Sequence, residues 1–305
     1  MARALLRLMI SAAVLAGLIS LPARAAENKM AAAKARAELY AQKSLEYRKQ
    51  APRQLTPSEF KAEQLMAQAG RIIPGCESPE QTEPAIKLYR DAVKTAPGYD
   101  QAWWGLAMAL WAKATLMTQE PKPDKQAARA VLQQARQACE AALKINPMSP
   151  GGNYWLSNVI LTEAGLKNIV QQAFLLPEIF KLSDKVAEVD PFFDYGAVFR
   201  TYATVLVAVP GWLSRSLGFE PQIILPYLDK SIELEPDCFV NYISRADVYL
   251  KVGGPANRDL ALKDLEYVIT RSPDSLPGYE ADNRARQKAA AKTWRQITGR
   301  DFPAR

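Results

Sequence analysis

Two segments of the sequence are crowded with aromatic side chains that could contact a ligand. Trp103, Trp104 and Trp111 lie in the first segment, and Tyr154 and Trp155 lie in the second. Aromatic side chains that stay partly exposed form walls for apolar or peptide ligands. The same residues could instead pack in the core between two helices. The sequence leaves both interpretations open.

Two arginines interrupt apolar helical segments and could recognise an anion. A buried guanidinium needs an acceptor, and Arg200 and Arg245 could find one internally. A guanidinium without an internal partner would be a fork for an anionic ligand. Both interpretations are kept, and the candidate internal partners are Glu163, Asp194 and Asp247.

The chain of 305 residues contains no histidine. This excludes a Ser-His-Asp triad, a Cys-His pair and a zinc site that contains histidine. The sequence also lacks a glycine-rich phosphate loop, a nucleophile elbow and a metal-binding motif. A glycosidase with two carboxylates stays formally possible. We therefore expect a protein that is not an enzyme and that holds no metal or cofactor.

The N-terminus has the parts of a secretory signal peptide. Arg3 and Arg7 precede an apolar run over 8–21, and Pro22 and the small residues Ala23 and Ala25 follow it. This pattern predicts export to the periplasm, with cleavage after Ala25. An uncleaved anchor is the alternative, but the run is shorter than the ~20 residues of a spanning helix. No cysteine lies near the cleavage point for lipid attachment.

The charge of the mature chain is close to neutral. Removing residues 1–25 takes away three arginines and no acidic residue, so 36 basic and 32 acidic residues remain, a net charge of +4. This total predicts neither nucleic-acid binding nor attraction to a membrane surface. We also expect no transmembrane span in the mature chain.

Three cysteines are too few for a disulfide framework. Cys139 lies at a predicted core position and is expected to be a buried free thiol. Cys76 and Cys238 lie in predicted turns about three repeats apart, and a bond between them would need close curvature of the chain.

Five prolines end similar helical phrases, which indicates an internal repeat. In the first phrase Ala85, Tyr89 and Ala92 lie 12, 8 and 5 residues before the proline, on one helical face. A second helix follows each proline after a short turn. The pattern predicts an all-α fold of antiparallel helix pairs. The prolines are Pro97, Pro147, Pro191, Pro236 and Pro273.

These phrases resemble the tetratricopeptide repeat over roughly residues 57–275. The resemblance implies a right-handed superhelical solenoid, in which residues of each first helix line a concave surface. The residues placed there are Trp104, Met108, Trp111, Tyr154 and Asn158. Only Asn158 fits the carboxylate clamp of some members, so such a clamp is not expected.

The repeats are longer than the usual 34 residues. The extra residues fall between the two helices of a pair, near 115–126, 165–177 and 205–221. In a solenoid such insertions should cluster along one edge and form a binding site. Within the second, the run 169–180 is expected to be an extra buried helix, with a helix that contacts a membrane as the alternative. Trp212 in the third would plug this edge or contact a partner.

The segment 195–237 resembles the periplasmic T component associated with TRAP-type (tripartite ATP-independent periplasmic) transporters. The motif carries over to Gly196, Arg200, Pro210, Gly211 and Trp212. Membership in this family would imply an exported helical protein with an apolar cavity. Tyr202 and Arg245 are further candidate binding residues. Some members of the family are lipoproteins, whereas this chain lacks the cysteine that would carry the lipid.

The sequence thus predicts four parts. A signal peptide over 1–25 precedes an N-terminal helix in 26–56, and a repeat domain over 57–277 precedes a capping helix and tail in 278–305. Thr56 is the expected N-cap of the first repeat helix, with Pro57 and Glu59 after it.

The expected function is binding, without catalysis. The partner would be a periplasmic substrate-binding protein, or the ligand a small apolar or anionic molecule, and the chain could be a homo-oligomer. A general envelope scaffold that recognises peptides is the alternative, and an enzyme of unfamiliar type is the third reading. We expect no nucleic acid as a partner.

Overall fold

The computed structural model describes residues 25–49, 53–167, 169–210 and 220–303. These residues form twelve α-helices and short 3₁₀ turns, and they contain no strand. The all-α prediction is therefore confirmed. The helices form two compact units, one of residues 46–190 and one of residues 25–45 and 191–303.

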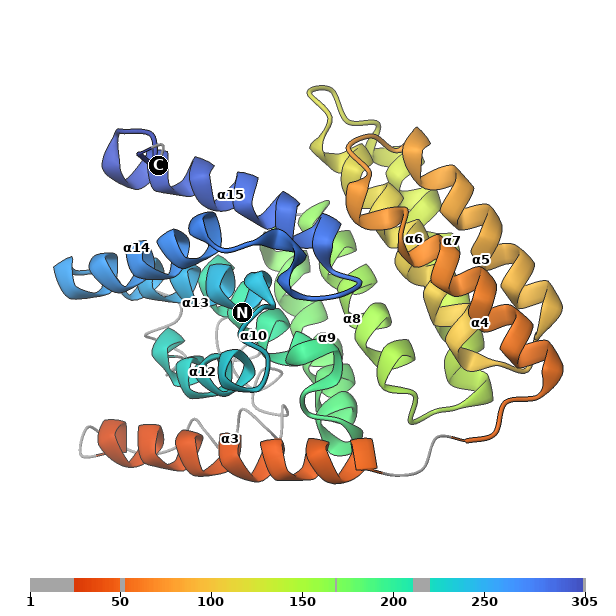
Figure 1. Cartoon of the computed structure of the whole chain (residues 1–305), viewed down its shortest axis with the longest axis horizontal. Coiled ribbons are helices and arrows are strands. Elements are labelled where there is room, and N and C mark those ends of the chain that lie inside the picture. The colour runs from red at the N-terminus through yellow and green to blue at the C-terminus, as the bar shows by residue number, and fades with distance from the viewer. Residues whose placement is uncertain (1–24, 50–52, 168, 211–219, 304–305) are drawn as a thin grey trace. The chain divides into compact units, whose positions relative to one another are not determined.

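The first unit consists of three successive helix pairs (Figure 1). Each helix packs against the next one along the chain, and α6 also packs against α4 and α8. The first helix of each pair thus contacts the first helix of the neighbouring pair. The helices are α4 (Pro57–Gly70), α5 (Glu83–Thr95), α6 (Asp100–Gln119), α7 (Lys125–Ile145), α8 (Pro150–Gly165) and α9 (Ile169–Val189).

Small residues let these helices approach closely. The predicted stripe of α5 is buried, with Ala85 and Ala92 fully inaccessible. Tyr89 lies against Gly105 of α6, where an added Cβ would be 2.5 Å from the Tyr89 ring. Cys139 is also buried and free, as expected. Small and large side chains therefore meet where α5 packs against α6.

The insertions of the first unit are mostly helical. The first lengthens α6 and α7 and leaves only residues 120–124 as the connection. The second insertion, near 165–177, leads into α9. This helix runs through Pro177 without interruption, so 169–180 is not a separate helix. The clustering of the three insertions stays a prediction. The third lies in the other unit and includes residues 211–219, which are outside the described residues.

The start of α4 is the capping box that the sequence predicts. The Glu59 N–H donates to Thr56 Oγ1 at 3.3 Å, and the Thr56 N–H donates to Glu59 Oε2 at 2.8 Å. Pro57 takes the first helical position. The side chains of Thr56 and Glu59 thus each accept a hydrogen bond from a backbone N–H that has no partner within the helix.

We expect Thr56→Ala to lower the free energy of unfolding by about 1 kcal/mol, because it removes this cap. Hydrogen bonds from Thr56 hold the pKa of the Glu59 carboxyl below its ordinary value of 4.5. A lowered pKa stabilises the fold above the unfolded value and loses that effect as the pH falls through the folded value. The difference between wild type and variant should therefore shrink below about pH 4.5.

Urea unfolding followed by circular dichroism measures this difference at pH 7 and at pH 3 to 4. Thr95→Ala is the matched control, because the Thr95 hydroxyl donates only to the Asp91 carbonyl in its own helix. Equal losses in the two variants would contradict the capping role.

The second unit contains the remaining helices. The helix α13 (Phe239–Val252) packs against α10 (Ala197–Ala208), α12 (Leu225–Leu234) and α14 (Pro255–Thr270), and α14 packs against α15 (Glu280–Thr298). Phe239, Leu265 and Val268 are buried in its core, where Tyr242 and Tyr267 stack with ring centroids 4.3 Å apart. The helix α15 lies within 278–305, where the sequence predicts a capping helix and a tail.

The first described helix, α3 (Ala25–Lys49), is assigned to this second unit up to Leu45. Its side chain Tyr40 lies within 6.2 Å of the Phe199 ring and 6.1 Å of the Tyr227 ring. Lys230 of α12 forms an ion pair with Glu38 at 2.6 Å. The sequence predicts this helix, but not that these contacts lie between about 160 and 190 residues away along the chain.

Candidate functional site

The packing of α6 against α8 brings the predicted aromatic residues of the first unit together. Trp104 lies on Gly151 of α8, where an added Cβ would be 2.6 Å from the indole. Glycine is required here because any side chain would overlap this ring. Gly151, which is far from Trp104 in the sequence, thus leaves the space that the indole occupies.

Trp111 is held by α8 through a hydrogen bond and a ring contact. Its indole N–H donates to Thr162 Oγ1 at 2.8 Å, and its ring centroid lies 5.2 Å from that of Trp155. Tyr154 and Trp155 meet edge to face at 4.9 Å. Thr162 is a contact that the sequence reasoning missed, because only the pairing of α6 and α8 places its hydroxyl opposite an indole.

The residues of this cluster differ in exposure. Tyr154 is buried, whereas Trp104, Met108, Trp111 and Asn158 are half-buried. Asn158 donates to the Tyr154 carbonyl at 3.0 Å. We call the half-buried set Trp104, Met108, Trp111, Trp155 and Asn158 the α6–α8 wall. Its character is apolar and aromatic, without a charged residue among its members.

Arg200 lies in α10 of the second unit and is 9% exposed. Its guanidinium forms an ion pair with Asp194 at 2.6 Å, which is one of the three predicted partners. It also donates to Asn241 Oδ1 at 2.9 Å and to the backbone carbonyls of Asp194 and Tyr195. This network supports the internal salt bridge rather than the fork for an anionic ligand.

The same network holds an unusual turn before α10. Asp194, Tyr195 and Gly196 have φ of +46°, +54° and +93°, in or near the left-handed region. Such backbone is strained in residues other than glycine. Besides Arg200, the Tyr279 hydroxyl donates to the Asp194 carboxylate. Burial raises the pKa of Tyr279 far above its ordinary value, so this hydroxyl keeps its proton.

Arg245 also has internal partners, but not the predicted ones. It donates to both carboxylate oxygens of Asp264, at 2.9 and 2.6 Å, and to Asp229 at 2.8 Å. Asp264 is 5% exposed and comes from α14. The sequence prediction considered Asp247, which lies two residues from Arg245 in α13. Residues two apart do not face each other on a helix.

The other candidate residues have separate positions. Tyr202 is buried in α10 at 7% exposure, and Trp212 lies outside the described residues. Cys238 is a buried free thiol, and burial raises its pKa to about 12. Cys76 is also free. Most of the predicted site residues therefore belong to one wall in the first unit or to two arginine networks in the second, of which that of Arg200 is buried and that of Arg245 is partly exposed.

Comparison with known proteins adds no information on the function of this chain. A scan against protein-family models and a search of curated proteins found no match to this chain. The described helices include none that is long and apolar enough to cross a bilayer. The described residues also contain no group of three or more cysteines and carboxylates arranged to bind a metal ion. The fold and site define a protein of paired helices with an aromatic wall.

Proposed function

We propose that this chain is a non-catalytic, exported binding or scaffold protein of the tetratricopeptide type. It acts beside a solute transporter, as the T component of TRAP-type systems does. The signal-like N-terminus and the resemblance over 195–237 support export and this role. The helix pairs of each unit are tetratricopeptide-like repeats, stacked within the unit as a right-handed superhelical solenoid.

The pairing of helices supports the repeat assignment. In the first unit α4, α6 and α8 follow one another as first helices, and α6 contacts both of the others. In the second, α13 contacts both α10 and α15. Contacts between successive first helices are what stacking of such repeats requires. The lengths of α6 and α7, 20 and 21 residues, fit elongated repeats.

The observation that carries the binding role is the α6–α8 wall. Trp104, Met108 and Trp111 lie one turn apart on α6 and stay half-buried. A core residue of the same helix, such as Leu110, is only 4% exposed. We infer that the wall takes an apolar group, either of a small ligand or of a partner protein. Arg200 and Arg245 are engaged internally, which favours an apolar over an anionic ligand.

Capture from periplasmic extract with the mature chain, followed by native mass spectrometry, tests this role. We expect a retained substrate-binding protein or a bound apolar molecule. Capture of cell-wall or secretion proteins instead would replace the transporter role by a general envelope scaffold. Activity of the purified chain on a substrate would overturn the non-catalytic role.

A pair of variants tests whether the wall is the site. Trp104→Ala/Met108→Ala should weaken binding of the captured molecule, or of the apolar dye Nile red, by at least about tenfold, because two contact side chains are lost. Trp294→Ala removes a half-buried tryptophan of the second unit and is the matched control. Equal weakening by both variants, with both folded by circular dichroism, would contradict the wall as the site.

A further inference from the structure

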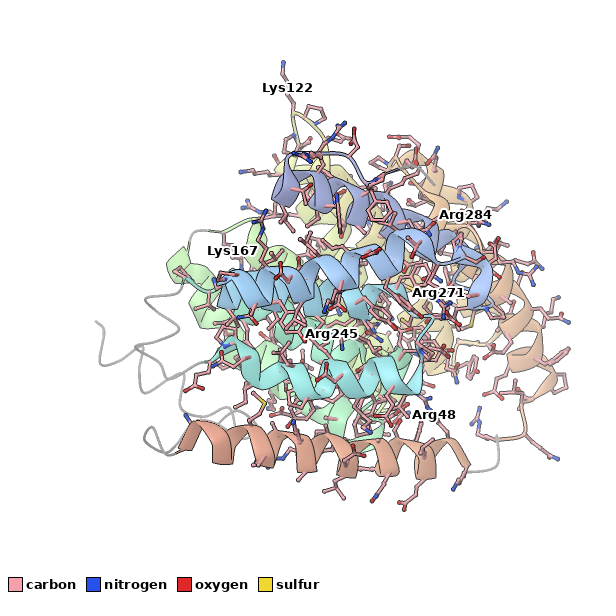
Figure 2. The ribbon with its side chains drawn as sticks, turned by 60° about the vertical axis from the view of Figure 1, so that its left-hand side comes forward. Arg48, Lys122, Lys167, Arg245, Arg271 and Arg284 are labelled. Carbon is pink, nitrogen blue, oxygen red and sulfur yellow. The ribbon has the colours of Figure 1, made fainter. Side chains whose placement is uncertain are left out.

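The helix α3 covers part of the second unit, although the rest of that unit begins about 140 residues later in the chain. Figure 2 shows α3 at the edge of this unit, beside α12, as Figure 1 does. The residues that follow α3, up to Asp190, form the first unit. The helix is therefore tied to the surface that it covers only through the whole first unit.

Aromatic rings form the centre of this contact. Tyr40 of α3 meets Phe199 of α10 and Tyr227 of α12, with ring centroids 6.2 and 6.1 Å away. The rings of Phe199 and Tyr227 are stacked on each other at 4.8 Å. Both are buried, as is the neighbouring Lys230 of α12. We call Phe199, Tyr227 and Lys230 the α3 seat.

Two ion pairs add charge recognition to this contact. Lys230 pairs with Glu38 of α3 at 2.6 Å, and Lys29 of α3 pairs with Glu220 at 3.6 Å. Lys230 also pairs with Glu233 of its own helix. The Lys230 side chain is 10% exposed, whereas that of Glu38 is 61% exposed. The seat thus presents a largely buried cation to an acidic residue at the rim of the covering helix.

The remaining buried side chains of α3 are small. Ala33, Ala37 and Ala41 lie on one face of the helix and are buried. A buried methyl group contributes much less than a buried leucine or phenylalanine. The larger apolar side chains Leu39 and Leu45 are exposed instead. An element held by few large apolar contacts opens before the core does.

The sequence of α3 also favours a helix without its seat. The helix has 25 residues and is rich in alanine, lysine, arginine and glutamate. These residues have high intrinsic helix propensity, and the length exceeds the roughly 12–15 residues below which an isolated helix is marginal. The helix can therefore leave one seat and occupy another in the same conformation.

We propose that the α3 seat binds the α3 helix of a second copy of this chain, so that two copies exchange these helices and form a dimer. The seat selects a helix with an aromatic residue, an acidic residue two positions before it and a face of alanines. The helix of another copy has all three, so exchange needs no new interface. The chain's own helix competes at high local concentration, so the dimer forms when α3 loosens or the protein is concentrated.

Mixing two charge-reversed mature chains tests the exchange. In Glu38→Lys and in Lys230→Glu, the helix and the seat of the same chain carry like charges. After exchange between the two variants, each helix meets a seat of opposite charge. We expect the mixture to dimerise at least about tenfold more tightly than either variant alone, because two like-charge contacts become two ion pairs. Sedimentation velocity measures the dimer.

Glu46→Lys is the matched control for this mixture, since it makes the same charge change at an exposed position of α3. Mixed with Lys230→Glu, it should not dimerise more tightly, because exchange leaves one like-charge contact in place. Circular dichroism shows whether all variants are folded. A charge-reversed mixture that dimerises no better than this control would overturn the exchange.

A labelled peptide of residues 26–49 tests the seat separately from the dimer. Glu38→Lys/Tyr40→Ala loosens the helix of the full mature chain, so this chain should bind the peptide at least about tenfold more tightly than wild type. Leu39→Ala/Glu46→Lys makes matched changes at exposed positions of α3 and should bind the peptide as wild type does. Fluorescence anisotropy measures the binding.

Two results of the peptide measurement would overturn the proposal. Absence of binding to the loosened chain, or equally tight binding by the control, would show that the seat does not accept a helix in trans. Peptide binding without a dimer in the charge-reversed mixture would exclude a second copy as the occupant and leave a helix of another protein. None of these outcomes depends on the α6–α8 wall.

Discussion

Gly196→Ala should lower the free energy of unfolding by about 3 kcal/mol, for two separate reasons. Gly196 has φ of +93°, and a side chain in left-handed backbone costs roughly 1–2 kcal/mol. An added Cβ would also lie 2.2 Å from Ser231 Oγ and 2.9 Å from Ser231 Cβ. Overpacking of this kind adds about 1–3 kcal/mol, because α12 must shift to relieve it.

Two further variants separate these contributions. Gly278 has φ of +85° and no atom within 4 Å of an added Cβ, so Gly278→Ala should show only the backbone cost. Ser231→Gly added to Gly196→Ala should recover the steric part, apart from the cost of a glycine in α12. Urea unfolding with circular dichroism measures all three. If Gly278→Ala were as destabilising as Gly196→Ala, the close contact with Ser231 would have no energetic role.

Arg200→Met should destabilise the fold by about 3–5 kcal/mol, which is the cost of removing one partner from a buried ion pair. Methionine fills much of the same space but donates no hydrogen bond. Of the two side chains that donate to the Asp194 carboxylate, only the Tyr279 hydroxyl would remain, and Asn241 Oδ1 would lose the guanidinium donor. The carbonyl oxygens of the left-handed turn would also lose the guanidinium.

Arg136→Met is the matched control for this loss. Arg136 pairs with Glu163 at 2.7 Å, but its side chain is 27% exposed against 10% for Arg200, so we expect a loss of about 1 kcal/mol or less. Arg200→Lys should fall between wild type and Arg200→Met, because lysine keeps the charge without the planar fork. Unfolding free energies compare the three variants. A loss of 1 kcal/mol or less in Arg200→Met would show that the network is not important for stability.

The two arginines show how far local sequence reasoning could go. Asp194 is six residues from Arg200, and the sequence prediction included it as a partner. Asp264 is 19 residues from Arg245, on the other helix of its pair, and the prediction missed it. Which carboxylate faces a guanidinium depends on how two helices rotate against each other. That rotation depends on how the side chains of both helices pack, and the spacing of residues along one helix does not predict it.

The aromatic wall was also predictable only in part from the sequence. The spacing of Trp104, Met108 and Trp111 already places them on one side of a helix. That Trp104 rests on Gly151 and Trp111 donates to Thr162 depends on the approach of α8. The glycine pair Gly151 and Gly152 lies in the first turn of α8, where it is only a weak sequence signal of close packing. It does not say which ring uses the space.

The sequence by itself determined the all-α class, the helix ends at the five prolines, the capping box at Thr56 and the buried stripes of small residues. Each of these depends on interactions within one or two turns of a helix, so the local residues suffice. Only the tertiary structure decided the partners of Arg245, the attachment of α3 to the second unit, and the conversion of the first two insertions into longer helices. These features depend on contacts between helices far apart in the chain, where side-chain shape and burial select one arrangement among several that local pattern allows.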